Sequence, residues 1–450
     1  MTRSIGIICV NTPDLNNTQI PVSTRQSHRN AAHASTARAL PLFEDPGLNL
    51  NALLALGAAG TGASEVGEVL GAVDTINTAG SGYQTYTDTF RFWADRLTRL
   101  ADGAGAEGRE DTLRRLSLRA AQYYARALSF VLGTDKPGDE ESLYRSGRSA
   151  WDTFAALCEP VAVQASVPWG RARMPLWFFR PDTSAQPRPT IILTNGGDGQ
   201  NVDMWTYGIP AALERGWNAL VYDGPGQGQL LFINEIPFHS HWEDVVTPLV
   251  DWLHRRPEVD PARIALTGFG MAGNLAPRAA AFEHRLAALV AMPGCVSPWR
   301  SLPADIRSIV SSDKGETNQI WNTDVVPGLS DTERFTYMKR FEAFSPAALR
   351  AARAGELFTD FWTPARNIID LDITEVAPRI TVPTLVLDYE EERCYPGQAE
   401  DLYRLLRAPK DYVKLGALDG ARLHCSPMAP QVHCEVAFDW LEDVLSAGTR

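Results

Sequence analysis

The stretch RIALTGFGMAGNLAPRAAAF, residues 263–282, decides the fold. It begins with an apolar run typical of a buried strand and ends, over residues 275–282, in a helical pattern. Three glycines lie between these two parts, Gly268, Gly270 and Gly273, and they predict a sharp turn. A strand, a glycine-rich turn and a helix together make a nucleophile elbow, whose expected pattern is G-x-S-x-G. We therefore expect an α/β protein with this turn at one end of its sheet.

The position of the nucleophile is occupied by glycine. Where the pattern requires serine the sequence has Gly270, and where a last glycine is usual it has Ala272. Glycine has no side chain, so a covalent intermediate cannot form at that position. Taken alone, the stretch is equally compatible with a glycine-rich strand-to-helix turn that has no catalytic role.

The chain on both sides of this turn has the pattern of a parallel sheet. After Pro160, short apolar runs bounded by Gly and Pro alternate with helical patterns. The runs span residues 174–179, 190–194, 218–222, 264–267, 286–291, 384–387 and 412–415. Continuous hydrophobicity is typical of strands buried on both faces, and the intervening helices suit right-handed crossovers. The predicted fold class is α/β, with a mostly parallel sheet covered by helices.

We expect the chain to be organised in parts of different character. Residues from 11 to about 40 are rich in polar side chains with little apolar periodicity, and they predict a mobile N-terminal arm over residues 1–40. Residues 41–160 carry apolar side chains at helical spacing and predict a separate helical domain, followed by a core over residues 161–450. Within the core, residues from about 298 to 383 form a helical insertion with exposed-type aromatics. This insertion either helps to roof a pocket at the carboxyl ends of the strands or is a packed surface excursion.

An acid and a histidine follow the elbow in a meaningful order. The apolar run 384–387 leads into a cluster of carboxylates over residues 388–396, and His424 lies in a loop ahead of the last helix. The order elbow, acid, histidine is that of α/β-hydrolases and differs from the orders of chymotrypsin-like and subtilisin-like enzymes. The elbow is therefore expected to belong to a catalytic constellation.

A second glycine-rich loop predicts half of an oxyanion hole. The apolar run 190–194 is followed by Asn195-Gly196-Gly197-Asp198, in which consecutive glycines let backbone N–H groups converge. The other half would come from the N–H of Met271, the residue after the elbow position. Asp198 is also a weak candidate for substrate binding. The further glycine-rich segment 224–228 lacks the ending of a phosphate loop and predicts a tight turn near the pocket.

Several of these segments together resemble a known family. Residues 190–228 (TIILTNGGDGQ…LERGWNALVYDGPGQGQ), the elbow with the helix after it, and Tyr395-Pro-Gly-Gln-Ala399 are similar to α/β-hydrolases with an N-terminal helical cap. That group includes 2,6-dihydroxypseudooxynicotine hydrolase, the yellowish-green pigment hydrolases of fungi and the fermentation-respiration switch proteins. The resemblance covers roughly residues 85–450. It implies an α/β-hydrolase core under a helical cap domain, acting on a small ketone, ester or polyketide-like molecule in a catabolic or secondary-metabolite pathway.

The resemblance also implies the site residues. His424 matches the catalytic histidine of the family, Glu392 matches its acid, for which Glu391 is the neighbouring alternative, and Gly270 matches the nucleophilic serine. Met271, Gly197 and Asp198 would supply the oxyanion hole. A hydrolase that loses a triad member keeps about 10³–10⁴-fold acceleration over water, and a histidine held by a carboxylate remains a general base.

Three functions remain open at this point. The first is an enzyme that uses His424 and Glu392 for non-covalent catalysis, by cyclisation, C–C or C–O lysis, isomerisation or direct-water hydrolysis of a natural-product-like substrate. The second is a serine hydrolase of esters or C–C bonds whose nucleophile has been replaced by Gly270. The third is a non-catalytic ligand-binding protein on a hydrolase fold.

Composition excludes several classes of protein. Lys plus Arg is 42 and Asp plus Glu is 54, so the formal charge is −12, which argues against a nucleic-acid partner. No apolar run approaches the roughly 18 residues of a membrane span, and the segment 5–10 is too short for a signal peptide. We expect a soluble, cytoplasmic protein that binds a small molecule, without membrane contact, with homodimers as a further expectation from cap-domain relatives.

Neither a cofactor nor a metal site is expected. The six cysteines lie far apart without a CxxC pair, and His239 and His241 lack a third ligand in view. Cys295, Cys394 and Cys425 fall near the predicted pocket. None of these three cysteines lies on a strained strand–helix turn that would present it, so we expect them to be structural.

Overall fold

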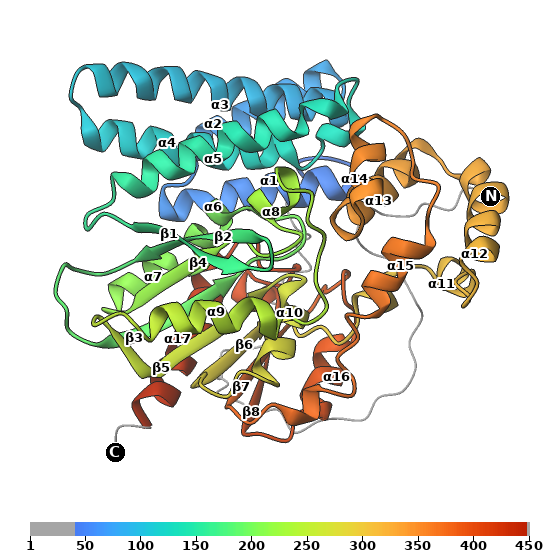
Figure 1. Cartoon of the computed structure of the whole chain (residues 1–450). Coiled ribbons are helices and arrows are strands. Elements are labelled where there is room, and N and C mark those ends of the chain that lie inside the picture. Colours follow the sequence, from blue (N-terminus) through green and yellow to red (C-terminus); the bar gives the residue numbers. More distant parts are fainter. Residues whose placement is uncertain (1–40, 448–450) are drawn as a thin grey trace.

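An eight-stranded sheet lies at the centre of residues 41–447, the part of the chain that the computed structural model describes (Figure 1). Its strand order is β1-β2-β4-β3-β5-β6-β7-β8. The strands are β1 (Val163–Trp169), β2 (Ala172–Phe179), β3 (Arg188–Thr194), β4 (Asn218–Tyr222), β5 (Val259–Phe269), β6 (Ala288–Met292), β7 (Thr384–Tyr389) and β8 (Lys410–Leu415). The predicted N-terminal arm, residues 1–40, lies outside the described residues.

The sheet is parallel from β4 through β8 and antiparallel at its other edge. Strands β3 to β8 pair in parallel, whereas β1 pairs with β2, and β2 with β4, in the antiparallel sense. The predicted α/β class with a mostly parallel sheet is confirmed. The edge strand β1 is missing from the prediction because it is only partly buried, with polar Gln164 and Ser166 in its sequence, so it has no continuous apolar run.

Helices cover both faces of the sheet and leave a crevice at one end of it. The helices α9 (Glu243–Leu253) and α10 (Ala272–Ala280) contact one another and lie in front of the sheet in Figure 1, whereas α7 (Ile209–Glu214) and α17 (Pro430–Ala447) contact one another behind it. Strand β3 has β4 on one side and β5 on the other. Such a reversal of strand order opens a ligand-binding crevice at the carboxyl ends of the strands.

The N-terminal helices form a layer beside the sheet. They are α1 (Pro46–Gly57), α2 (Val66–Ala79), α3 (Tyr83–Ala106), α4 (Glu110–Leu128) and α5 (Glu140–Ala156). Each longer helix buries an apolar stripe, such as Tyr86, Phe90 and Leu97 of α3, which recur at helical spacing. In Figure 1 this layer lies above the sheet, where α4 contacts α6 (Asn201–Thr206) and α5 contacts α8 (Gly228–Phe232).

The insertion before β7 is helical, and its buried side chains belong to the same hydrophobic core as those of the sheet. Its helices are α11 (Ala304–Ser308), α12 (Lys314–Ile320), α13 (Asp331–Phe341), α14 (Pro346–Arg353) and α15 (Trp362–Ile369), and α16 (Gln398–Leu405) follows β7. The expectation of exposed aromatic side chains is wrong for most of them. The buried ones are Trp321, Phe335, Tyr337, Phe341, Phe344, Phe358 and Phe361. They pack against one another, for example with 4.4 Å between the ring centroids of Trp321 and Phe361, because the short helices of the insertion bury their aromatics together.

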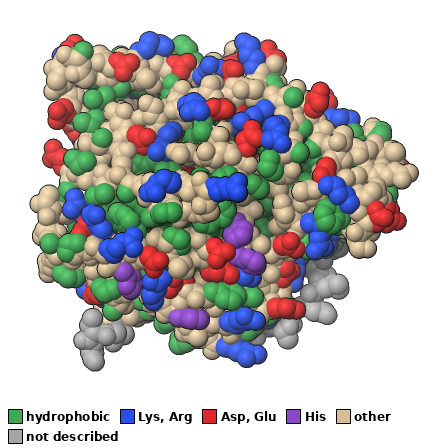
Figure 2. All heavy atoms as spheres, viewed as in Figure 1, with side chains coloured by type: hydrophobic (Ala, Val, Ile, Leu, Met, Phe, Trp, Pro, Cys, Tyr) green, Lys and Arg blue, Asp and Glu red, His purple; other side chains and the backbone are tan. Residues whose placement is uncertain are grey.

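The surface carries charges of both signs. On the face that Figure 2 shows, Lys and Arg side chains are interspersed with Asp and Glu rather than gathered into one basic patch. Among the helices of residues 41–447, none combines the length and the apolar character that a membrane crossing requires.

Candidate active site

The turn between β5 and α10 has the backbone geometry of a nucleophile elbow. Gly270 adopts φ +60°, in the left-handed region that glycine enters without strain, and its N–H donates to the carbonyl of Met292 at 2.8 Å. Gly273, one residue after Ala272, lies against β6, where an added Cβ would come within 1.8 Å of the Pro293 carbonyl oxygen. In the pattern G-x-S-x-G the last glycine normally permits such close packing. Here Gly273, one position later, permits it.

The space at Gly270 would accommodate a side chain. A Cβ added to Gly270 would have His424 Nε2, Cys425 Sγ and the Cα of Gly196 as its nearest neighbours, each at 3.9 Å. These are ordinary van der Waals distances, so nothing fills the place of the missing side chain. A group attached there would face the histidine, as a nucleophile does toward its base.

Glu392 and His424 form a hydrogen-bonded pair. Glu392 Oε2 lies 2.7 Å from His424 Nδ1, and Oε1 accepts from the backbone N–H groups of Cys394 at 2.7 Å and Tyr395 at 3.0 Å. With its side chain only 3% exposed, the carboxylate is held by three donors in a buried place. Nε2, the other ring nitrogen, is thereby left toward Gly270.

The neighbouring glutamate has a different role. Glu391 pairs with Arg422 at 3.2 Å and with Arg393 at 3.5 Å, and it makes no ion pair with His424. Of the two acids between which the sequence leaves a choice, Glu392 is therefore the one that holds the histidine.

The interaction between Glu392 and His424 favours the charged form of each side chain. Burial works against the charge of Glu392, but the imidazole and the two backbone donors bring the pKa of this carboxyl below its ordinary value of 4.5. Burial also works against the charge of His424, but the carboxylate of Glu392 raises the pKa of the imidazole above 6.5. The ring therefore holds a proton more tightly than an exposed histidine, which makes it a stronger base once deprotonated.

Three backbone amides face the same cavity as His424. Met271, Gly197 and Asp198 all line it. Within residues 41–447 no hydrogen bond engages the N–H of any of the three, whereas the N–H of Gly196 donates to Asn195 Oδ1 at 2.8 Å. Met271 is the N-cap of α10, where N–H groups lack partners in the helix and the helix dipole is positive. These amides are available to stabilise an oxyanion.

The glycine-rich segment 224–228 supports this loop rather than lining the cavity. Gln227 lies in the turn after β4 and donates through Nε2 to the carbonyl of Asn195 at 2.5 Å, while its Oε1 accepts from the N–H of Gly224 at 3.1 Å. The amide side chain therefore ties the turn to the loop that carries Gly197 and Asp198.

The cavity measures about 240 Å³ and is walled by distant parts of the chain. Apolar side chains come from the N-terminal helices, such as Leu50 and Leu54, and from the insertion, such as Phe335 and Phe341. The insertion thus lies over the carboxyl ends of the strands and encloses the space in front of His424 (Figure 1). An apolar enclosure strengthens hydrogen bonds and charges within it.

Polar residues of this cavity are absent from the sequence prediction. Tyr395 places its ring 5.9 Å, centroid to centroid, from that of His424. Arg126 of α4 donates to Asp203 of α6 at 2.8 Å in a buried ion pair, and Arg340 of α13 also lines the cavity. Of these residues, only Tyr395 could have been identified from the sequence, because it lies close to the acids in the segment that follows the apolar run 384–387. The others have no motif and come together only in three dimensions.

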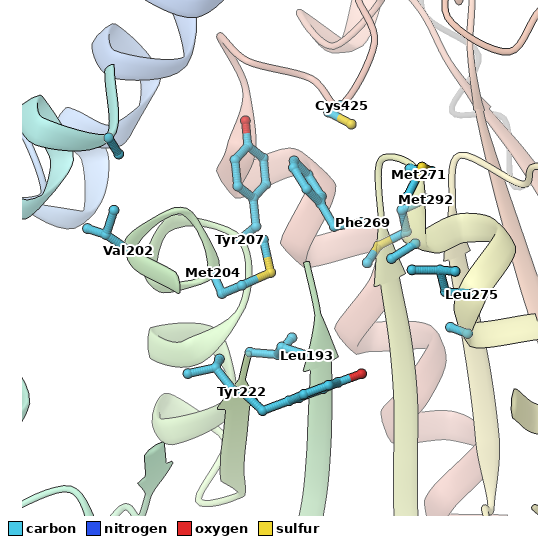
Figure 3. Close-up of a cluster of buried hydrophobic side chains, with 14 of the residues drawn as sticks. Leu193, Val202, Met204, Tyr207, Tyr222, Phe269, Met271, Leu275, Met292 and Cys425 are labelled. Carbon is cyan, nitrogen blue, oxygen red and sulfur yellow. The ribbon is translucent and has the colours of Figure 1, made fainter. Parts of the chain in front are cut away.

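Cys425 lines the cavity, near which the sequence had placed it. Figure 3 shows Cys425 and Met271 at the same end of the strands, although they come from separate segments. Cys425 has φ +60°, rare for a residue with a side chain, and it lies in the loop between β8 and α17 rather than on a strand–helix turn. Burial raises the pKa of its thiol above 9.0, which keeps the thiol protonated at neutral pH.

The other cysteines and histidines behave differently. Cys394 also lines the cavity, whereas Cys295 is fully buried outside it, and burial raises the pKa of the Cys295 thiol.

Two groups of side chains have the residue types that bind metal ions. His239 Nε2 lies 3.1 Å from Asp244 Oδ2, so Asp244 is a third group of metal-ligand type beside His239 and His241, which the sequence analysis did not identify. The donor atoms of Glu392, Cys394 and His424 lie within 4.8 Å of one another. Two of these three residues, Glu392 and His424, are hydrogen-bonded to one another.

Solved structures with this architecture are known. The chain superposes on 2,6-dihydroxy-pseudo-oxynicotine hydrolase with a TM-score of 0.63 and 21% identity, over 87% of this chain and 96% of that one. It superposes on AbyA5 with a TM-score of 0.57 and 16% identity, over 89% and 98%. At these identities the likeness shows the fold.

Curated relatives are fungal. Hydrolyase poxO of Penicillium oxalicum is 27% identical over 57% of this chain and 62% of its own length. Alpha/beta hydrolase psoB of Aspergillus fumigatus is 29% identical over 57% and 60%, and 20-hydroxy-prefusarin hydrolase FUS2 of Gibberella moniliformis is 28% identical over 56% and 62%. The match therefore spans about three fifths of the length of these relatives.

A sequence profile of the alpha/beta hydrolase family matches residues 191–431, which include β3, the elbow, the acid and the histidine. The match covers more than half of the chain, and the sheet order, the elbow and the Glu392–His424 pair agree with it. The chain belongs to the alpha/beta hydrolase family, and the predicted α/β-hydrolase fold is confirmed.

Proposed function

We propose that this protein is an enzyme that uses His424 as a general base, without a covalent intermediate, on a small natural-product-like substrate. The observation that carries the proposal is the intact pair of Glu392 and His424, 2.7 Å apart, with Nε2 facing the open space at Gly270. A substrate carbon, a hydroxyl group or a water molecule can approach the base where a serine would otherwise stand.

The chemistry needs only proton transfer and charge stabilisation. Nε2 of His424 takes a proton from the substrate, and the electron pair moves onto a carbonyl oxygen, which becomes an oxyanion or enolate. In this proposal the N–H groups of Met271, Gly197 and Asp198 donate to that oxygen, and the imidazolium then returns the proton to the product. A positioned general base contributes about 10²–10⁴-fold, and one oxyanion donor about 10²–10³-fold.

This sequence of steps is compatible with several reaction types. Cyclisation, C–C or C–O lysis, isomerisation and hydrolysis by a directly activated water all begin with a proton transfer to a base. The fungal relatives, among them a 20-hydroxy-prefusarin hydrolase, support a ketone or ester substrate from secondary metabolism. The apolar wall of the cavity supports a substrate that is largely hydrocarbon.

A second candidate has its own supporting observation. The 3.9 Å clearances around Gly270 match the room that a serine side chain needs, so the protein is alternatively a serine hydrolase whose nucleophile has been replaced by glycine. The two candidates differ in what serine does at this position.

The test is a panel of aryl ketones, β-diketones and activated esters, assayed with the protein as it stands and with the variants His424→Ala and Gly270→Ser. Non-covalent catalysis predicts that the protein as it stands turns over at least one ketone or diketone, that His424→Ala abolishes this turnover and that serine does not increase it. If the protein as it stands turns over nothing in the panel and only Gly270→Ser hydrolyses the esters, the second candidate is favoured. Binding of a ligand without turnover by either form contradicts both and leaves a ligand-binding protein.

A further inference from the structure

Arg340 is a cation in the cavity wall without a partner. It lies near the C-terminal end of α13, half-buried, and lines the cavity together with His424. Across residues 41–447 neither an ion pair nor a hydrogen bond engages its guanidinium group. Arginine carries five N–H donors and stays charged, so an unpaired guanidinium in the cavity wall is free to bind an anionic group.

The other cations of this wall are neutralised within the protein. Arg126 is paired with Asp203 at 2.8 Å, and both side chains are buried. Lys339, the neighbour of Arg340, donates to Glu342 Oε1 at 2.6 Å and lies 3.8 Å from Glu140 Oε1. Arg340 is therefore the one positive charge that the described wall of the cavity leaves without a carboxylate.

Arg340 also lies on the catalytic side of the cavity. Its charge acts on the phenol of Tyr395, whose ring is 5.9 Å from that of His424, and offsets part of the burial that raises the pKa of this phenol. Because Arg340 and His424 line the same cavity, a small molecule bound to the guanidinium can extend toward the base.

We propose that Arg340 is a binding subsite for a carboxylate of the substrate, and that it orients the apolar remainder of the molecule toward His424. The inference rests on the proposed function, because it takes the cavity to be the substrate site. The planar fork of arginine matches the two oxygens of a carboxylate, and such charge-assisted pairs are stronger than neutral hydrogen bonds. The substrate class is then an amphipathic carboxylic acid that also carries a ketone or ester.

The position of Asp198 limits where the carboxylate binds. Its side chain lines the cavity from the loop after β3 and forms no ion pair with any residue of the described range. Repulsion between like charges keeps a substrate carboxylate away from it. The charge of Asp198 also reaches Lys339 of α13, so Arg340 has to outweigh this repulsion, and the acid group is expected at the guanidinium itself.

The experiment compares two ligands that differ only in charge. Phenylbutyrate and phenylbutyramide have the same apolar body, and their dissociation constants are measured by titration calorimetry at neutral pH with the full chain. The variants are Arg340→Gln, Arg340→Lys, which keeps the charge, and Arg340→Met, a second uncharged variant in case the first does not fold. Arg407→Gln, an exposed arginine away from the cavity, is the control.

We expect the unmodified protein to bind the acid at least about tenfold more tightly than the amide. Arg340→Gln and Arg340→Met should abolish this preference without weakening amide binding, Arg340→Lys should keep part of it, and Arg407→Gln should keep all of it. Equal affinity for the two probes, including no binding of either up to the solubility limit, would overturn the proposal, as would a preference that survives in the uncharged variants. No turnover is measured, so the acid preference and the base catalysis can fail independently.

Discussion

Restoring serine at Gly270 is the perturbation whose consequences the structure defines best. An added Cβ meets nothing closer than 3.9 Å, so Gly270→Ser should fold without repacking. The backbone φ of +60° costs a residue with a side chain about 1–2 kcal/mol, and a variant with this strain should melt only a few degrees lower. The hydroxyl would then face His424 Nε2, with the amides of Met271 and Gly197 beside it.

The gain in activity follows from what is already in place. The base, its carboxylate and the free amides are present, so serine supplies the one missing group of an acyl-transfer site. We expect hydrolysis of an activated nitrophenyl ester to rise by at least about 10²-fold, with a burst of nitrophenol stoichiometric with the protein.

Gly270→Ala is the matched control for this experiment. Alanine has the same Cβ and the same backbone strain but no hydroxyl, so it should show the loss in melting temperature without the burst. A folded Gly270→Ser protein that gives no burst, or a burst of equal size with alanine, would refute the interpretation of this turn as a nucleophile elbow beside a competent base.

Three further predictions concern charge. The rate of the base-catalysed reaction should rise with pH through a midpoint above 6.5, because the pKa of His424 is raised. Glu392→Gln should move this midpoint to lower pH, because the neutral amide no longer favours the imidazolium. A pH–rate profile or a histidine NMR titration whose midpoint is unchanged in Glu392→Gln would contradict this. Asp203→Asn should lower the free energy of unfolding by about 3 kcal/mol, since it leaves Arg126 buried without its counter-ion, and urea unfolding that matches the unmodified protein would exclude such a role. Burial lowers the pKa of the His433 ring to about 4, so as the pH falls the unfolded chain takes up a proton at this histidine before the folded protein does. About 3 kcal/mol of stability should therefore be lost as the pH falls from 6.5 to 4. His433→Gln should remove this part of the pH dependence, and unchanged acid sensitivity of that variant in urea unfolding would contradict the prediction.

The sequence predicted the elements whose signal is local. Continuous apolar runs identify the strands from β2 to β8, and Gly270 and Met271 are located by the turn between a strand and a helix. His424 and Glu392 are located by their order after the elbow. In each case the information lies within a few residues of chain, or in the order of such segments, because parallel strands bring their carboxyl ends to one edge of the sheet.

The residues that the sequence did not predict depend on tertiary packing. Arg340 and Arg126 come from an insertion and from an N-terminal helix, and nothing near them in the chain distinguishes them from surface arginines. The aromatic side chains of the insertion were expected at the surface because short helices give little periodicity, yet they bury one another. The left-handed backbone of Cys425 follows from the path of the loop that carries His424, which no residue pattern indicates.

The most direct test is whether His424 removes a proton from a substrate carbon in the absence of a nucleophile. The measurement is the exchange of α-hydrogen for deuterium in a panel of aryl ketones, followed by NMR in D₂O with the unmodified protein and with His424→Ala. We predict exchange at a rate that exceeds that of His424→Ala by at least about 10²-fold, and that Gly270→Ser does not increase. Exchange rates that are equal with and without the histidine across the panel would contradict base catalysis at this site.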